Sequence, residues 1–277
     1  MLSDLHFGEV VSKKQVYGFN EYNVKIAERR LKKIGDGAVK VARDYFAGSS
    51  KLIIDGAVVV MAGDLVSGDI HEELSRSNEQ TTMESVAHFV PLISEEIIGK
   101  LYTEFKKIHV VSVAGNHDRL YKKTPSKDTS TSAASWVFGK WIQDRFSDVE
   151  GCTFDISEAA DAYHQIYSTR FCITHGDCWK ASDSVIGALG PVKRGTLKKS
   201  FRDKQMGNPF DIILCGHWHS YISAPSQGFI CNGSLKSYDE YSARCGFAPE
   251  PPIQALFLCT PERGVTFSSP IFGNSSS

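Results

Sequence analysis

Apolar residues along this chain fall into two patterns, which together predict a fold with both helices and strands. Recurrence at every third or fourth position predicts two amphipathic helices, at residues 20–46 and 82–107, with a kink or a break at Pro91 in the second. Short continuous apolar runs predict strands buried on both faces. These runs lie at residues 57–61, 109–114, 170–174 and 211–215, with closing strands at 229–231, 255–259 and 265–267. The fold class is therefore α/β, predicted as a single domain at 1–273 followed by a disordered tail at 274–277.

Side chains that can bind metal ions follow the apolar runs in short clusters, most of which contain glycine. Five such clusters occur, and they contain Asp4 and His6, Asp64, Asn116 with His117 and Asp118, His175, and His217 with His219. A single histidine of this kind is usually a hydrogen-bonded structural residue. Five clusters at strand ends, however, can converge at one edge of a sheet, which is where α/β proteins bind ligands. The pattern therefore predicts one site built from all five clusters.

The first cluster lies almost at the start of the chain. Asp4 and His6 are two positions apart, so at the end of a strand their side chains would point to the same side. Only Met1, Leu2 and Ser3 precede Asp4, which leaves that strand much shorter than usual. We therefore expect the native chain to carry a few more apolar residues ahead of Met1.

The donor atoms of the clusters indicate the kind of metal centre. Imidazole nitrogens, carboxylates and one asparagine carbonyl, without thiolate, favour Mn²⁺, Fe, Zn²⁺ or Co²⁺ over a structural zinc site. Seven ligands are too many for one ion with an open position, but they suit two ions that share a bridging carboxylate. Two ions about 3.5–4 Å apart stabilise the attacking and leaving oxygens of a displacement at phosphorus. The residues therefore predict hydrolysis of a phosphoester.

The composition of the chain restricts the binding partners and the cellular compartment that we expect for this protein. The formal net charge of -1 argues against a globally cationic protein that binds nucleic acid or membranes through its overall charge. The seven cysteines are odd in number and form no Cys-x-x-Cys pair, which favours a reducing compartment over a disulfide framework. Because no apolar stretch reaches the roughly 18 residues of a membrane span and no signal peptide is evident, the expected location is the cytoplasm, with no membrane association.

The clusters together resemble a known family. Ser3-Asp4-Leu5-His6, Gly63-Asp64, Gly115-Asn116-His117-Asp118, His175-Gly176 and Gly216-His217-Trp218-His219 are similar to the five ordered motifs of the calcineurin-like metallophosphoesterases. That resemblance implies a four-layer α/β/β/α sandwich with two facing mixed β-sheets. It also implies a site for two divalent metal ions at one edge of the sandwich, with Mn²⁺ as the first choice.

The resemblance assigns a role to each residue of the motifs. One metal would be bound by Asp4, His6 and His219, the other by Asn116, His175 and His217, with Asp64 as the bridging ligand. A water or hydroxide that bridges the metals would be the nucleophile. His117 would act catalytically, stabilising the transition state or protonating the leaving oxygen, with Asp118 orienting it and Arg119 available to contact phosphate.

The second motif bears on the substrate. Gly63-Asp64-Leu65-Val66 lacks the arginine that protein phosphatases of this family carry in the corresponding Val-Asp-Arg-Gly run, so the chain looks closer to the phosphodiesterase and repair-nuclease branches, including phage members. A basic region, Lys180–Lys204, could bind nucleic acid, with Trp179 and Phe201 stacking on bases, or could be an ordinary solvated helix and loop. A phosphomonoesterase that acts on a nucleotide or metabolite and a non-catalytic scaffold are the alternative functions.

Overall fold

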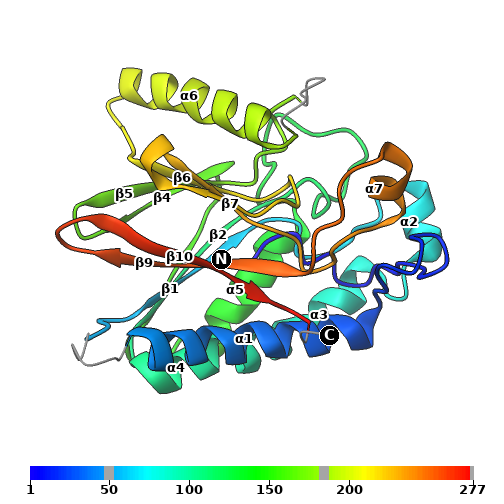
Figure 1. The fold of residues 1–277 in the computed structure, drawn as a ribbon, viewed down its shortest axis with the longest axis horizontal. Coiled ribbons are helices and arrows are strands. Elements are labelled where there is room, and N and C mark those ends of the chain that lie inside the picture. The colour runs from blue at the N-terminus through cyan, green and yellow to red at the C-terminus, as the bar shows by residue number, and fades with distance from the viewer. Residues whose placement is uncertain (47–52, 181–186, 275–277) are drawn as a thin grey trace.

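Four layers make up this protein in the computed structural model, which describes residues 1–46, 53–180 and 187–274 (Figure 1). One outer layer contains α1 (Val24–Phe46), α3 (Thr82–Ile93), the π-helix η1 (Ser94–Gly99), α4 (Lys100–Phe105) and α5 (Ala134–Arg145), and the opposite one contains α6 (Leu189–Gln205). Three further short helices of the described residues are α2 (Glu72–Ser77), the 3-10 helix η2 (Pro225–Gln227) and α7 (Glu240–Cys245). The predicted disordered tail at 274–277 lies, except for Asn274, outside the described residues.

Two sheets lie face to face between the helical layers. The first has the order β1-β2-β3 and is parallel, with β1 (Ala57–Ala62), β2 (Ile108–Val113) and β3 (Cys152–Ile156). The second is mixed and has the order β4-β5-β6-β8-β7, with β4 (Asp161–Ile166), β5 (Thr169–Thr174), β6 (Ile212–Cys215), β7 (Ile222–Ala224) and β8 (Phe229–Cys231). An antiparallel hairpin, β9 (Ile253–Thr260) and β10 (Gly264–Phe272), is a third hydrogen-bonded unit.

The alternation of side chains along the strands shows why the protein has four layers. In β1, Val59 and Met61 pack into the core beside α1 and α3, whereas Val60 and Ala62 pack into the core between the two sheets. Strands β5 and β6 alternate in the same way, between that inner core and a third core beneath α6. Continuous apolar runs are needed because both faces of these strands are covered. The expected α/β fold class is confirmed, and Figure 1 shows helices on the outer faces of the two sheets.

The first two residues join the hairpin to the first sheet. The amino group of Met1 donates a hydrogen bond to the Ala255 carbonyl in β9 (2.6 Å), and the Leu2 amide donates to the Val60 carbonyl in β1 (2.7 Å). Met1 and Leu2 therefore lie between β1 and β9, and the hairpin belongs to the same layer as β1, β2 and β3. With the antiparallel hairpin included, this layer is mixed as well.

The two predicted helices are present and differ from the observed ones mainly at their boundaries. The helix predicted at 20–46 begins at Val24, because the side chain of Asn23 accepts a hydrogen bond from the Ile26 amide and satisfies the first turn. Pro91 does not break the second tract, which continues from α3 through η1 into α4. Within the part of the chain that is described, no helix combines the length and apolar character needed to cross a membrane.

Candidate metal centre

The site lies where β1, β2, β5 and β6 end. Asp64 follows β1, Asn116 follows β2 and His175 follows β5, each within a few residues of the end of its strand. His217 and His219 follow β6. Because β1 and β2 are parallel to each other, as are β5 and β6, these strand ends meet at one edge of the sandwich. The structure therefore brings together the candidate ligands that follow these four strands.

Asp4 and His6 reach the same edge by a different route from the one predicted. Leu2 pairs with β1 through a single bridge to Met61, and the chain then leaves the strand conformation. Asp4 and His6 have φ values of 52° and 49°, in the left-handed region. The strand alternation that was expected to align these side chains is thus absent, and the left-handed backbone at both residues aligns them instead.

Left-handed backbone is a feature shared by most of the candidate ligands. Asp64, His217 and His219 have φ values of 52°, 69° and 51°, in addition to Asp4 and His6. This conformation costs a non-glycine residue about 1–2 kcal/mol. Such strain gathers at functional sites, where the surrounding structure holds the backbone in place. The five residues are therefore positioned at the expense of local stability, as expected of a binding site.

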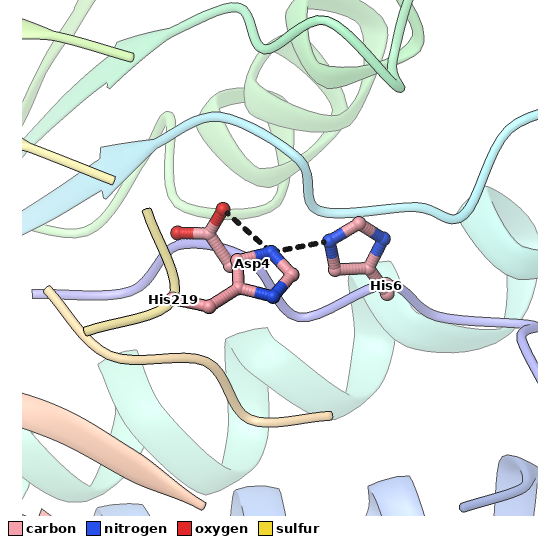
Figure 2. Close-up of side chains that lie close together, drawn as sticks. All are labelled: Asp4, His6 and His219. Carbon is pink, nitrogen blue, oxygen red and sulfur yellow. Dashed lines mark hydrogen bonds and ion pairs between the residues drawn. The ribbon is translucent and has the colours of Figure 1, made fainter. Parts of the chain in front are cut away.

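The first cluster contains Asp4, His6 and His219 (Figure 2). The Nε2 atoms of His6 and His219 face each other at 3.1 Å, and the Nε2 atom of His219 lies 3.4 Å from Oδ1 of Asp4. Asp4 is fully buried, and His6 is 1% exposed. Two imidazole nitrogens and a carboxylate oxygen that converge in a buried space repel one another unless a proton or a cation lies between them. This cluster therefore fits a metal ion.

The second cluster contains Asp64, His175 and His217, with Asn116 beside them. Nδ1 of His175 donates to the Ala62 carbonyl at 2.8 Å, which directs Nε2 toward the site. That nitrogen lies 3.0 Å from Oδ2 of Asp64 and 3.0 Å from Oδ1 of Asn116. Both oxygens are acceptors, so a metal ion in place of a proton on Nε2 would satisfy all three atoms. This cluster also fits a metal ion.

The pKa values of His175 and Asp64 in this second cluster are both shifted by the attraction between the imidazole and the carboxylate. Burial alone would lower the pKa of His175, but the neighbouring Asp64 carboxylate raises it well above its usual value. Burial alone would raise the pKa of Asp64, but His175 and His117 hold it well below its usual value. The carboxylate is thus maintained in its charged form, which is the form that binds a cation.

Two glycines allow the loops after β1 and β2 to approach each other. Gly63 has a φ of +84°, and a Cβ there would lie 2.6 Å from the Cα of Gly115. A Cβ on Gly115 would lie 2.2 Å from Oδ1 of Asp64. A side chain at either position would push the loops apart. The glycines in these two motifs therefore serve the packing of the site.

His117 lies beside the first cluster. Its ring centroid is 4.7 Å from that of His6, and its Nδ1 lies 2.8 Å from the Ser67 carbonyl. A hydrogen bond donated to this carbonyl leaves Nε2 as the nitrogen available to a substrate. The His117 amide also donates to Oδ1 of Asp64 at 2.7 Å, which fixes the backbone next to the second cluster.

The contacts of Asp118 indicate a role different from the one predicted for it. Its fully buried carboxylate accepts hydrogen bonds from the backbone amides of Asp64 (2.8 Å), Leu65 (3.0 Å), Val66 (3.3 Å) and Gly115 (2.8 Å). These contacts fasten the loop after β1 to the loop after β2. The hydrogen bond recorded for the His117 imidazole goes to the Ser67 carbonyl, so these contacts favour a structural role for Asp118, and its orienting role stays a prediction.

Arg119 forms hydrogen bonds within its own loop. Its guanidinium donates to the carbonyls of Asn116, Tyr121 and Lys122. These bonds hold the segment that follows the third motif. The predicted contact of Arg119 with phosphate is therefore not favoured by its position.

Sequence reasoning missed a buried charge network behind His6. Nδ1 of His6 lies 3.3 Å from Oε2 of Glu9, although poorly directed for a hydrogen bond, and Lys236 contacts both Glu9 (2.9 Å) and Asp239 (2.6 Å). Burial would raise the pKa of Glu9, but Lys236 lowers it to about 2. A charged carboxylate behind a metal-binding imidazole fixes the orientation of the ring. Glu9 follows the first motif closely, but its partner Lys236 lies 227 positions away, so only the fold could reveal the network.

Replacement of Glu9 tests this network. We expect Glu9→Gln to weaken metal binding by about 10–100-fold, because the carboxylate behind His6 is lost. The measurement is a titration of metal-free protein with Mn²⁺ by calorimetry. Glu21→Gln, at an exposed glutamate, is the matched control. Unchanged Mn²⁺ affinity in Glu9→Gln would show that the network does not support the metal ligand.

His71 is a second residue that sequence reasoning missed. It directly precedes α2, and its ring centroid lies 5.4 Å from that of His117. Burial, and then the proximity of His117, lowers the pKa of His71. Its only sequence signal is its place shortly after the second motif. It extends the row of imidazoles from His6 through His117 toward the surface.

The described part of the basic region Lys180–Lys204 has fewer cations available to bind nucleic acid than its composition suggested. Lys199 is 7% exposed and forms an ion pair with Asp161 of β4. Arg202 contacts the same carboxylate at 2.8 Å and Asp203 at 2.6 Å. These two cations therefore hold α6 on the second sheet.

The aromatic residues predicted to stack on bases also differ in exposure. Trp179 is 7% exposed and packs in the core beneath α6, so the prediction that it stacks on nucleic acid is wrong. Phe201 is 67% exposed. Residues 181–186, which belong to the same basic region, lie outside the described residues.

Comparison with known proteins agrees with the geometry of the site. The family model of the calcineurin-like phosphoesterases matches residues 1–221, which include all the candidate ligands. A search of curated protein sequences found no significant match. Among solved structures, a novel archaeal phosphodiesterase is 13% identical, with 87% of this chain and 92% of that chain covered and a TM-score of 0.39.

Two further solved structures illustrate the range of similar proteins. Vps29 from Entamoeba histolytica, complexed with zinc, is 12% identical, with coverage of 85% and 89% and a TM-score of 0.32. A predicted phosphoesterase from Streptococcus pneumoniae is 14% identical, with coverage of 98% and 94% and a TM-score of 0.30. Because the family model matches most of the chain, including every motif of the site, this protein belongs to the calcineurin-like phosphoesterase family.

Proposed function

We propose that this protein is a phosphodiesterase that depends on two divalent metal ions, with Mn²⁺ as the first choice. The observation that carries the proposal is the convergence of two Asp/His clusters at one edge of the sandwich, each with two buried ligands and one half-buried histidine. The ligand atoms within each cluster lie within 4.8 Å of one another, as expected around a single ion. Neither cluster contains a cysteine, which favours a catalytic site over a structural zinc site.

The residues of the site would have separate roles in metal binding and in proton transfer. Asp4, His6 and His219 would hold one ion, and Asn116, His175 and His217 the other, with Asp64 as the shared ligand. When bound, the ions would supply positive charge to the phosphoryl oxygens and lower the pKa of water. His117 would donate a proton from Nε2 to the leaving oxygen, since its Nδ1 is engaged by the Ser67 carbonyl.

Hydrolysis of a diester is favoured over that of a phosphoprotein monoester. The segment after Asp64 reads Leu65-Val66-Ser67, and the side chains of Leu65 and Val66 are fully buried in the core. No cation from this segment could therefore neutralise the second negative charge of a monoester. A diester carries a single charge and needs less neutralisation.

A panel of substrates tests the proposal. Purified protein with added Mn²⁺ is assayed on bis-(p-nitrophenyl) phosphate, p-nitrophenyl phosphate and a labelled oligonucleotide. We expect turnover of the diester to exceed that of the monoester, and His117→Gln to lower kcat for the diester by about 10²-fold or more, with metal content unchanged. His88→Gln, at a histidine on α3 that contacts Glu28, is the matched control.

The other outcomes separate the alternative functions. Faster turnover of the monoester would overturn the diesterase proposal in favour of a phosphomonoesterase. Cleavage of the oligonucleotide would identify the diester as nucleic acid. Inactivity toward all three substrates, with no metal in the purified protein and none taken up, would indicate a scaffold.

A further inference from the structure

A pocket of about 510 Å³ lies between α1 and the loop that precedes it. The first turns of α1 form one wall, the loop at residues 13–21 forms the other, and Gly273 and Asn274 lie beside them. The described residues that line the pocket include none of the candidate metal ligands. Its volume is within the range of about 300–1,000 Å³ that is typical of sites for small molecules.

Cations predominate among the side chains that line this pocket. Both walls contribute them: Lys13 from the loop, and Arg29, Arg30 and Lys33 from α1. Glu21 supplies one carboxylate against these four cations. Because the whole chain has a formal net charge of -1, the excess of positive charge is local to this pocket. A concave site with such an excess favours an anionic ligand.

Arg30 distinguishes this pocket from an ordinary basic surface. It is 9% exposed, and it donates to four neutral oxygens, the carbonyls of Leu235, Lys236 and Glu21 and Oδ1 of Asn20. No carboxylate of the described residues forms an ion pair with it, and none contributes to the shift of its pKa. The hydrogen bonds therefore satisfy the donors of a buried guanidinium, but no anion compensates its charge.

Arg29 increases the need for an anion. Burial lowers the pKa of Arg30, and the nearby charge of Arg29 lowers it further. An anion in the pocket would oppose both effects, because it would attract the two guanidinium groups that now repel each other. Arg29 and Lys13 are exposed, and no side-chain hydrogen bond or ion pair is recorded for either within the described ranges. Both are therefore available to contact a ligand directly.

Phe19 adds an aromatic surface to the same pocket. Its side chain is 52% exposed, and its ring meets that of Tyr238 in a T-shaped contact with the centroids 5.6 Å apart. The contact holds the Phe19 ring in place while half of the side chain stays open to solvent. Nucleobases stack on aromatic side chains in this way. An exposed ring beside Lys13 and Arg29 fits the base and the phosphate of a nucleotide.

We propose that this pocket is a second binding site, separate from the metal centre, for a free nucleoside monophosphate. The phosphate is bound by Lys13 and Arg29 and lies over the charge of Arg30, while the base stacks on Phe19. A phosphate dianion compensates the buried guanidinium, and its oxygens form charge-assisted hydrogen bonds with the two exposed cations. The volume of the pocket suits one nucleotide.

The experiment is a calorimetric titration of metal-free protein with AMP, so that the metal centre neither binds phosphate through an ion nor hydrolyses the ligand. We expect the double variant Lys13→Gln/Arg29→Gln to weaken AMP binding by about tenfold or more, because two charged contacts are lost. Lys25→Gln/Lys32→Gln is the matched control. It removes two exposed cations of α1 that do not line the pocket, and AMP should bind to it as to the wild type.

Three further ligands test the parts of the nucleotide. Adenosine, which lacks the phosphate, should bind at least about tenfold more weakly than AMP. Phe19→Leu should weaken AMP binding by about fivefold or more and leave the affinity for inorganic phosphate unchanged, because only the base stacks on the ring. A 5′-phosphorylated trinucleotide carries the same group at the end of a nucleic acid and should bind no more tightly than AMP.

Absence of AMP binding to the metal-free protein, or equal weakening by the two double variants, would overturn the proposal. Equal affinities for AMP and inorganic phosphate, with no effect of Phe19→Leu, would overturn the assignment to a nucleotide. Tighter binding of the trinucleotide would overturn it in favour of a nucleic-acid end. Arg30 is left unchanged throughout, since its bonds to Leu235 and Lys236 also hold the fold.

Discussion

Replacement of Asp64 by asparagine is expected to abolish metal-dependent hydrolysis while leaving the fold intact. Asparagine can still accept the His117 amide bond through Oδ1, and its amide group can donate to Nε2 of a neutral His175. What it removes is the negative charge that lies against His175 and His117. Since charge stabilisation by metal ions contributes several kcal/mol, kcat for the diester should fall by about 10³-fold.

Two measurements distinguish this effect from unfolding. Metal analysis should show that Asp64→Asn retains less Mn²⁺ than the wild type, and thermal unfolding of the metal-free proteins should give similar Tm values. In the metal-free state the pKa of His175 should fall, because the carboxylate that raises it is gone, and NMR titration reports this directly. Asp55→Asn, at an exposed carboxylate, is the control. Full activity in Asp64→Asn would remove this residue from the metal centre.

The strands at the centre of the fold could be predicted because burial on both faces requires a continuous apolar run. β1, β2, β5 and β6 were found in this way. β3 and β4 were missed, since both lie at the edge of a sheet and carry polar residues on their more exposed positions. An edge strand has no such requirement, so its sequence resembles that of a loop.

The ligand residues could be predicted because each motif follows a recognisable strand. The residues that hold the ligands and their loops in place could not be predicted. Glu9 and Lys236 meet only in the folded chain, and neither belongs to a local motif. The orienting role of Asp118 toward His117, its neighbour in sequence, was predicted with the other motif residues from the family resemblance. In the structure its carboxylate turns instead toward the backbone amides of Asp64 and Gly115. Adjacency in sequence does not determine the direction of a side chain in a loop.

Replacement of Asp118 by alanine should therefore lower stability as well as activity. The change leaves four backbone amides without this acceptor, three of them buried and that of Gly115 partly buried, on the loops after β1 and β2. At about 1–3 kcal/mol for each unsatisfied group, and with some relaxation, the free energy of unfolding should fall by at least about 3 kcal/mol. Urea denaturation of the metal-free protein measures it.

Activity should fall in parallel, because these loops carry Asp64 and Asn116, and a displacement of about 1 Å can cost about 10²-fold in rate. Asp118→Asn is the matched variant. Its Oδ1 can still accept from Leu65 and Val66, but its Nδ2 would face the amides of Asp64 and Gly115, so its stability should lie between those of wild type and Asp118→Ala. If Asp118 instead acted through His117, both variants would keep the wild-type free energy of unfolding and change only the pH profile of kcat. That result would restore the orienting role and contradict the structural one.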